Sequence, residues 1–189
     1  DRGSIAIELA HTKEWARQVV IDLYLDILGR MPDAAGLESW ATKLAGGTRT
    51  AAVGSDLYGS GEFFQNAGGN IPDYVDAVRR DVPNLAVVGI AGPGDPFANP
   101  EATLRTLRLV KQRHPDLLLC VSSNGLAVPK YLDEITELGI SHVTITMSTV
   151  DPDVAARIYR WVRDGRGQVF RGRAAGALLV ARQLESIRG

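Results

Sequence analysis

Three short runs of apolar residues in the second part of the chain restrict its fold class more than any other feature. The runs begin at residues 85, 117 and 143, and each has the length of a β-strand. They are apolar without strict alternation, which is typical of strands covered on both faces. Helical patterns that begin at Asn99-Pro100 and near Pro129 separate the runs, and another begins after the third run, at Asp151-Pro152. Since parallel strands need such crossovers, the order predicts an α/β fold with a parallel sheet.

The first 69 residues have a helical pattern instead. Apolar residues at helical spacing predict a helix from about Trp15 to Leu28 that ends at Gly29, and a second from about Asp33 to Leu44. A third helix is expected from Thr48, as its N-cap, through Leu57. The glycine-rich stretch 59–72 has turn composition and is interpreted as a linker. We therefore predict two domains, a small all-α module at 1–69 and an α/β domain at 70–189.

Composition and charge exclude several classes of protein. The net charge of −1 gives no overall attraction to nucleic acid or anionic lipid, and no apolar run reaches the ~18 residues of a membrane span. The single cysteine permits no internal disulfide and no all-cysteine metal site, so a reducing, cytoplasmic location is expected. Arginines are concentrated in residues 157–189. Because no aromatic residues are interleaved with them as in a nucleic-acid site, they indicate a solvated helix face and loop, and binding of an anionic partner is the alternative.

The segments that follow the three strands are the candidate site, because ligands of parallel α/β folds collect at the carboxyl ends of strands. They are 91–96, 122–125 and 148–151, all rich in glycine, proline and small polar residues. Such segments either form tight turns or present backbone groups to a ligand. Phe97 stands where a dinucleotide fingerprint needs its third glycine, and Ser122-Ser123 replaces the ribose-binding acid. The chain also lacks a phosphate-binding P-loop and a nucleophile elbow.

These segments carry a resemblance to a known family. Val88-Gly89-Ile90-Ala91-Gly92-Pro93-Gly94-Asp95-Pro96, Cys120-Val121-Ser122-Ser123-Asn124-Gly125-Leu126 and His142-Val143-Thr144-Ile145-Thr146 closely resemble the radical S-adenosylmethionine (SAM) core of NifB proteins. Val150-Asp151-Pro152 and Ile158-Tyr159-x-Trp161 extend the match, which covers about residues 70–188. NifB proteins assemble the iron–sulfur precursor of the nitrogenase cofactor.

The resemblance implies a fold and a set of ligand-binding residues. The fold would be a partial parallel (β/α) barrel of the radical SAM type, and the cofactors SAM and a [4Fe–4S] cluster. Gly92, Pro93, Gly94 and Asp95 correspond to the loop that receives the methionine ammonium of SAM. Ser122, Asn124, Thr146 and Ser148 correspond to residues that bind its carboxylate and ribose. Cys120 corresponds to a cysteine that holds a precursor cluster, although a lone cysteine in a strand is also commonly a buried apolar residue.

The sequence departs from this family at the cluster itself. Radical SAM chemistry requires three thiolates, usually from a CxxxCxxC motif, to hold a [4Fe–4S] cluster. Cys120 is the only cysteine of the chain. We therefore expect a NifB-like fragment that holds the SAM-binding part of an enzyme of nitrogenase cofactor biosynthesis and is inactive alone.

Residues 15–64 resemble a different family. Val20-x3-Tyr24-x2-Ile27-Leu28-Gly29-Arg30-x-Pro32-Asp33-x2-Gly36-Leu37-x2-Trp40 is similar to a helical bacterial domain of unknown function related to phycobilisome linker domains. That resemblance implies a helical fold and protein contacts, without catalysis. The alternative function is thus a non-catalytic interaction module with a remnant α/β domain. The expected partners are SAM, an iron–sulfur precursor or a partner protein, and self-association through exposed sheet edges is also expected.

Overall fold

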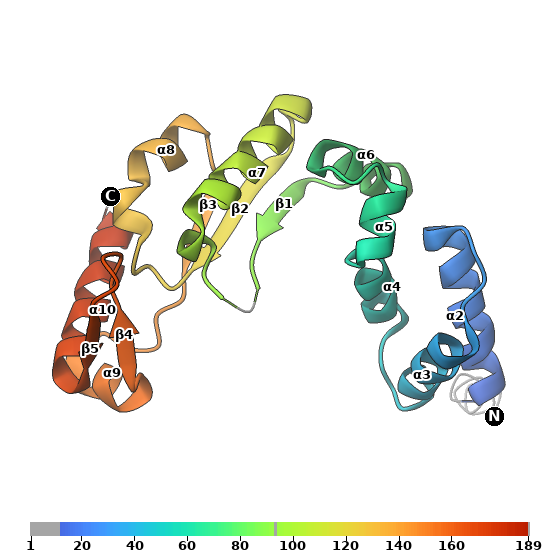
Figure 1. Cartoon of the computed structure of the whole chain (residues 1–189), viewed down its shortest axis with the longest axis horizontal. Coiled ribbons are helices and arrows are strands. Elements are labelled where there is room, and N and C mark those ends of the chain that lie inside the picture. Colours follow the sequence, from blue (N-terminus) through green and yellow to red (C-terminus); the bar gives the residue numbers. More distant parts are fainter. Residues whose placement is uncertain (1–11, 93, 189) are drawn as a thin grey trace, which may run out of the picture. The chain divides into compact units, whose positions relative to one another are not determined.

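The computed structural model describes residues 12–92 and 94–188, and it divides into two compact units (Figure 1). The first unit is Asp1–Val82 and the second is Pro83–Gly189. No helix within the described residues is both long and apolar enough to cross a membrane.

Across residues 12–82 the first unit is built from five helices whose ends follow local sequence signals. They are α2 (Lys13–Leu28), α3 (Ala34–Ala45), α4 (Thr50–Tyr58), α5 (Gly61–Asn66) and α6 (Ile71–Asp81). Asp33 caps α3 by accepting a hydrogen bond from the Gly36 N–H, and Gly29 ends α2 with φ of +69°. The two predicted helix starts near Trp15 and Asp33 are confirmed. Thr48 is not the N-cap of α4; Arg49 holds that position without a side-chain bond.

The core of the first unit extends beyond the predicted linker. Val20, Leu44 and Val53 from α2, α3 and α4 are buried together with Phe63 of α5 and Ala77 of α6. The stretch 59–72 is therefore not a linker, since it contains α5 and the beginning of α6. The structural division lies between residues 82 and 83 rather than at 69, because α6 packs on the helical core.

The second unit is centred on a small parallel sheet. Its strands are β1 (Val87–Ile90), β2 (Leu118–Ser123) and β3 (His142–Ile145), in the order β1-β2-β3. The helix α7 (Pro100–Arg113) lies between β1 and β2 in the chain, and α8 (Leu132–Glu137) lies between β2 and β3. Short 3-10 helices, η1 (Pro96–Ala98) and η2 (Val128–Lys130), precede α7 and α8. The predicted combination of helices with a parallel sheet is confirmed.

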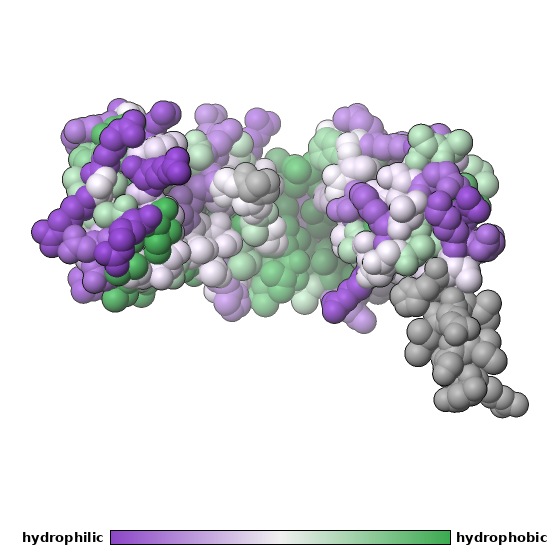
Figure 2. Space-filling model, turned by 90° about the horizontal axis from the view of Figure 1, so that it is seen from below, coloured by the Kyte–Doolittle hydropathy of each residue, from purple (hydrophilic) through white to green (hydrophobic). Residues whose placement is uncertain are grey.

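The two faces of the sheet are not equally covered. In β2, Leu119, Val121 and Ser123 are buried, whereas Leu118 is 44% exposed. Val87, which is aligned with Leu118 across the sheet, is 45% exposed. The space-filling view shows hydrophobic as well as polar side chains at the surface of the face that it presents (Figure 2). The expectation of strands covered on both faces is therefore wrong for the described residues, because only alternate positions of β2 are buried.

The chain after β3 begins with the helix expected at Asp151-Pro152 and continues with a hairpin and a long helix that the sequence pattern did not predict. Helix α9 (Pro152–Ile158) is followed by an antiparallel hairpin, β4 (Trp161–Arg163) and β5 (Val169–Arg171), and by the long helix α10 (Gly172–Arg188). Helices α9 and α10 lie against each other (Figure 1). They approach so closely at Gly176 that a Cβ there would collide with the Pro152 carbonyl oxygen. The expectation that the arginines of this part of the chain are solvated is confirmed, since each of six is exposed on or beside these elements: Arg157, Arg160, Arg163, Arg166, Arg171 and Arg173.

Candidate site at the carboxyl ends of the strands

The segments that follow β1, β2 and β3 are joined by hydrogen bonds at one edge of the sheet. Asp95, after β1, accepts hydrogen bonds from the Ser123 hydroxyl at 2.8 Å and the Asn124 N–H at 2.6 Å. The Thr146 N–H, after β3, donates to the Ser123 carbonyl oxygen at 2.8 Å. Ser123 at the end of β2 therefore lies between the other two segments, and the predicted grouping of these segments is present.

Asp95 is held at the centre of this network. Its Oδ1 accepts a hydrogen bond from the Phe97 N–H at 2.9 Å, which caps η1, while its Oδ2 accepts the two bonds from the end of β2. The helix η1 is fixed in turn, because the buried Thr103 hydroxyl of α7 donates to the Pro96 carbonyl oxygen at 2.7 Å. A carboxylate with three donors around it is a strong structural tie. Asp95 thus joins the β1 segment to β2 and leaves little of its own hydrogen-bonding capacity for a ligand.

Helix α10 supplies a side chain that the sequence analysis missed. Gln183 is 2% exposed, and its Nε2 donates to the Asn124 carbonyl oxygen at 2.9 Å and the Thr146 carbonyl oxygen at 3.0 Å. One turn later the Ser186 hydroxyl donates to the Gly125 carbonyl oxygen at 2.8 Å. Gln183 follows the buried Ala175 and Leu179 at spacings of four residues. The sequence signal for a buried polar contact here is a glutamine within an otherwise apolar helical stripe.

The segment after β2 must carry glycine at residue 125. Gly125 has φ of +79°, and a Cβ there would lie 2.9 Å from Cγ2 of Ile145 and 3.1 Å from Cγ of Gln183. Its N–H donates to the Ser123 hydroxyl at 3.1 Å. Glycine is thus required both by the backbone conformation and by the close approach of β3 and α10.

The other predicted residues lie around this network but do not form one cluster of contacts. Ser122 is half-buried on β2, with Thr144 of β3 as its neighbour across the sheet. The hydroxyls of Ser148 and Tyr159 share a hydrogen bond of 3.0 Å. Gly92 and Gly94 are exposed, and Gly94 has φ of +129°. Pro93 lies outside the described residues.

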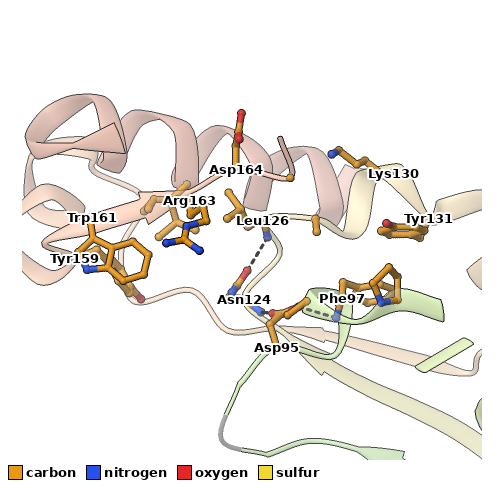
Figure 3. A pocket seen from close by; sticks show the side chains of 16 residues that line it. Asp95, Phe97, Asn124, Leu126, Lys130, Tyr131, Tyr159, Trp161, Arg163 and Asp164 are labelled. Carbon is orange, nitrogen blue, oxygen red and sulfur yellow. Dashed lines mark hydrogen bonds between the residues drawn. The ribbon is translucent and has the colours of Figure 1, made fainter. Parts of the chain in front are cut away.

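A cavity of about 690 Å³ opens beside the network, with side chains from both the strand ends and the hairpin around it (Figure 3). Asp95 and Asn124 line it; Ser122, Thr146 and Ser148 do not. One part of the wall is the stacked pair of Phe97 and Tyr131, whose ring centroids are 5.4 Å apart. Hairpin residues complete the lining, among them Trp161, with the Arg163 guanidinium 5.7 Å from its ring centroid. The cavity is thus an aromatic-walled space with charged groups at its rim.

Cys120 lies on the partly open face of the sheet. It is half-buried, and its neighbours across the sheet are Gly89 on β1 and His142 on β3. A Cβ added at Gly89 would contact the Cys120 Cβ at 3.7 Å, so the glycine leaves room beside the thiol. Among residues 12–92 and 94–188, no three side chains of His, Cys, Asp or Glu are grouped as a metal site would require.

The structure therefore defines the second unit as an α/β unit with a hydrogen-bonded network at the carboxyl ends of three parallel strands. Its relatives are FeMo cofactor biosynthesis proteins named NifB. The chain is 49% identical over 114 residues to NifB of Chlorobaculum tepidum and to NifB of Klebsiella pneumoniae, which is 60% of this chain. It is 52% identical over 85 residues, 45% of this chain, to NifB of Azotobacter vinelandii.

The matches cover only part of each protein. The 114 aligned residues are 27% of the Chlorobaculum protein and 24% of the Klebsiella protein. The 85 aligned residues are 17% of the Azotobacter protein. The chain thus spans about a quarter or less of the length of these relatives. Because 114 residues exceed the 82 of the first unit, the similarity must include the second.

The first unit has a separate match. Residues 10–67 fit the model of a domain of unknown function, DUF4214. Together the comparisons confirm both resemblances that the sequence motifs indicated, one to NifB proteins and one to a domain of unknown function.

Proposed function

We propose that the second unit is the SAM-binding part of a NifB-like radical SAM protein, with its sheet forming part of a (β/α) barrel. The observation that carries the proposal is the joining of three parallel strand ends by the bonds of Asp95 with Asn124 and of Thr146 with Ser123, in a chain that is 49% identical to NifB of Chlorobaculum tepidum over 114 residues. Strands adjacent in both chain and sheet, with helices between them, are the arrangement that builds such barrels.

The residues at the strand ends suit the polar groups of SAM in different ways. Gly92 and Gly94 offer backbone groups to the methionine ammonium, and the three bonds accepted by Asp95 fix the chain just after Gly94. The hydroxyls of Ser122, Thr146 and Ser148 and the amide of Asn124 can donate to the carboxylate or exchange hydrogen bonds with the ribose. Asp95 thus acts mainly by positioning the segment rather than by meeting the ligand alone.

The residues of this chain do not fit a [4Fe–4S] cluster. Such a cluster needs three or four thiolates, and these 189 residues contain only Cys120. The residue aligned with Cys120 on β3 is His142, whose imidazole is not a thiolate, so this pair of positions offers a single thiolate. We therefore assign no electron transfer to this chain and propose that it binds SAM without cleaving it. Cys120 is left for a single bond to an iron–sulfur precursor.

Calorimetric titration of the full chain with SAM tests the proposal. The wild-type chain should bind, and Asp95→Ala should weaken binding about tenfold or more, since it removes the acceptor of three hydrogen bonds. Asp133→Ala is the matched control, because Asp133 is an exposed acid on α8 of the same unit. Ser148→Ala provides a variant at an exposed position, where folding is less at risk.

Two results would contradict the proposal. One is the absence of any SAM binding by the folded wild-type chain. The other is an unchanged affinity in both Asp95→Ala and Ser148→Ala. After anaerobic reconstitution with iron and sulfide, SAM should remain intact under reducing conditions; its cleavage by this chain alone would refute the assignment as a non-cleaving part.

The second candidate is a non-catalytic interaction module, and it is favoured by the separate hydrophobic core of the first unit and the match at residues 10–67. Leu25 and Met31 are 46% and 56% exposed there and would serve as contact residues. A partner held by the full chain and lost in Leu25→Glu or Met31→Glu would support this function. A partner bound equally by the wild type, Leu25→Glu and Met31→Glu would contradict this function.

A further inference from the structure

We propose that Gln183 of α10 is a positioning residue that sets the spacing of the segments after β2 and β3. Gln183 would act on the ligand site by holding two backbone carbonyl groups, without touching the ligand. The identity of the ligand, SAM, rests on the proposed function; the control of the loop geometry does not. Helix α10 would then be part of the site although it belongs to neither strand-end segment.

The geometry of the Gln183 amide supports this role. Both of its partners, the carbonyl oxygens of Asn124 and Thr146, can only accept hydrogen bonds, so the NH₂ group must face them. The two N–H bonds of one planar nitrogen diverge at a fixed angle. The distances of 2.9 and 3.0 Å to the two oxygens therefore fix the carbonyls relative to each other.

Burial makes the two bonds costly to lose. Gln183 is 2% exposed, and an apolar side chain of similar volume could fill its place but could not satisfy the two carbonyl oxygens. Ser186 adds a second anchor on the Gly125 carbonyl oxygen, in the same segment after β2. The close approach of Gln183 to Gly125 also shows that this part of α10 fits against the backbone of the segment.

The positions held by Gln183 are those proposed to bind the ligand. Asn124 and Thr146 are exposed residues whose backbone carbonyls are tied to α10. The Asn124 Oδ1 accepts a hydrogen bond from the Leu126 N–H at 2.8 Å, so its amide nitrogen and the Thr146 hydroxyl are the groups offered to a ligand. Asn124 is tied to Asp95 as well, through its N–H. A shift of the segment after β2 would therefore move the segment after β1. Gln183 thereby influences all three segments through a single side chain.

The test compares three variants of the full chain. Gln183→Leu keeps the volume and removes both donors, and Gln183→Glu keeps the shape but places a carboxyl group opposite two carbonyl oxygens. Gln112→Leu is the matched control, since Gln112 is an exposed glutamine on the helix α7 of the same unit. The measurements are amide hydrogen exchange, affinity for SAM and the thermal midpoint as a function of pH.

In Gln183→Leu, the amides of residues 124–126 and 146–148 should exchange at least about tenfold faster than in Gln112→Leu, while those of α7 are unchanged. SAM affinity should fall about tenfold. In Gln183→Glu, burial favours the neutral carboxyl, which can donate one bond, so its midpoint should approach that of the wild type as pH falls from about 8 to about 5. A side chain that only fills space would leave the amide exchange of both segments in Gln183→Leu at the level of Gln112→Leu.

Unchanged exchange in both segments of Gln183→Leu, or a pH-independent deficit in Gln183→Glu, would overturn the inference. If Gln183→Leu fails to fold, the exchange of residues 124–126 and 146–148 in Gln183→Glu decides: relative to Gln112→Leu it should be faster at about pH 8, where the carboxylate has no proton to donate, than at about pH 5. If the wild-type chain takes up no SAM, the proposed function fails, whereas the exchange and pH measurements still decide the role of Gln183.

Discussion

Replacing Gly125 by alanine is the perturbation whose effect follows most directly from the structure. Alanine at φ of +79° costs roughly 1–2 kcal/mol because of the left-handed backbone. Its Cβ would also lie 2.9 Å from Cγ2 of Ile145 and 3.1 Å from Cγ of Gln183. Forcing an extra methyl group into such a site costs about 1–3 kcal/mol. We therefore expect Gly125→Ala to lower the free energy of unfolding of the second unit by about 2–5 kcal/mol.

Two glycines of the chain separate these contributions. Gly167, in the turn of the hairpin, has φ of +83° but no atom within 4 Å of an added Cβ. Gly167→Ala should therefore show the backbone cost alone, roughly 1–2 kcal/mol. Gly92, which follows β1 in the same unit, has neither a positive φ nor a close neighbour, and the stability of Gly92→Ala should be nearly that of the wild type.

The assay must report on the second unit by itself, because tryptophans of both units contribute to fluorescence. Denaturant titration followed by the NMR signals of β2 and β3 gives the free energy of unfolding of that unit. A loss in Gly125→Ala no larger than in Gly167→Ala would refute the close packing of β3 and α10 on the segment after β2. It would also remove the shape argument for Gln183.

Two further expectations concern other parts of the chain. Arg30 donates a hydrogen bond of 2.7 Å to Glu62 and holds the pKa of that carboxyl below its ordinary value. The ion pair therefore stabilises the first unit at pH values above the ordinary pKa of a glutamate. This stabilisation is lost as the pH falls through the lowered pKa of Glu62. Glu62→Gln should lower the thermal midpoint slightly at pH 7 and not at about pH 2, and an equal gap at both pH values would contradict the pairing. Within the described residues β1 and β3 each pair with one strand only, so we expect self-association that increases with concentration in analytical ultracentrifugation; a monomer at all concentrations would contradict this.

Features that depend on neighbouring residues could be predicted from the sequence. Gly29 ends α2, and Asn99 and Asp151 cap α7 and α9 as expected, because a cap is formed by residues three or four positions apart. The three parallel strands could be predicted for a similar reason, since strand-length apolar runs alternate with helical patterns. The grouping of Asp95, Asn124 and Thr146 followed from the general geometry of parallel sheets.

Features that depend on distant contacts could not be predicted in the same way. The strands of the hairpin have three residues each, too few to show a period, although Asp164 and Gly167 carry a turn signal that was overlooked. The role of Gln183 depends on the packing of α10 against two segments that are far away in the sequence, so it could not be predicted from neighbouring residues. The position of α6 likewise depends on packing against the first unit, which a composition shift at residue 69 does not reveal.

The long sequence separation of these contacts has a consequence for biosynthesis. Gln183 follows Asn124 by 59 residues, and Ser186 follows Gly125 by 61. During translation β1, β2 and β3 leave the ribosome before α10 does. The nascent chain must therefore hold its strand-end segments in a provisional arrangement, and binding competence at this edge would be acquired only after synthesis of the segment has passed residue 186.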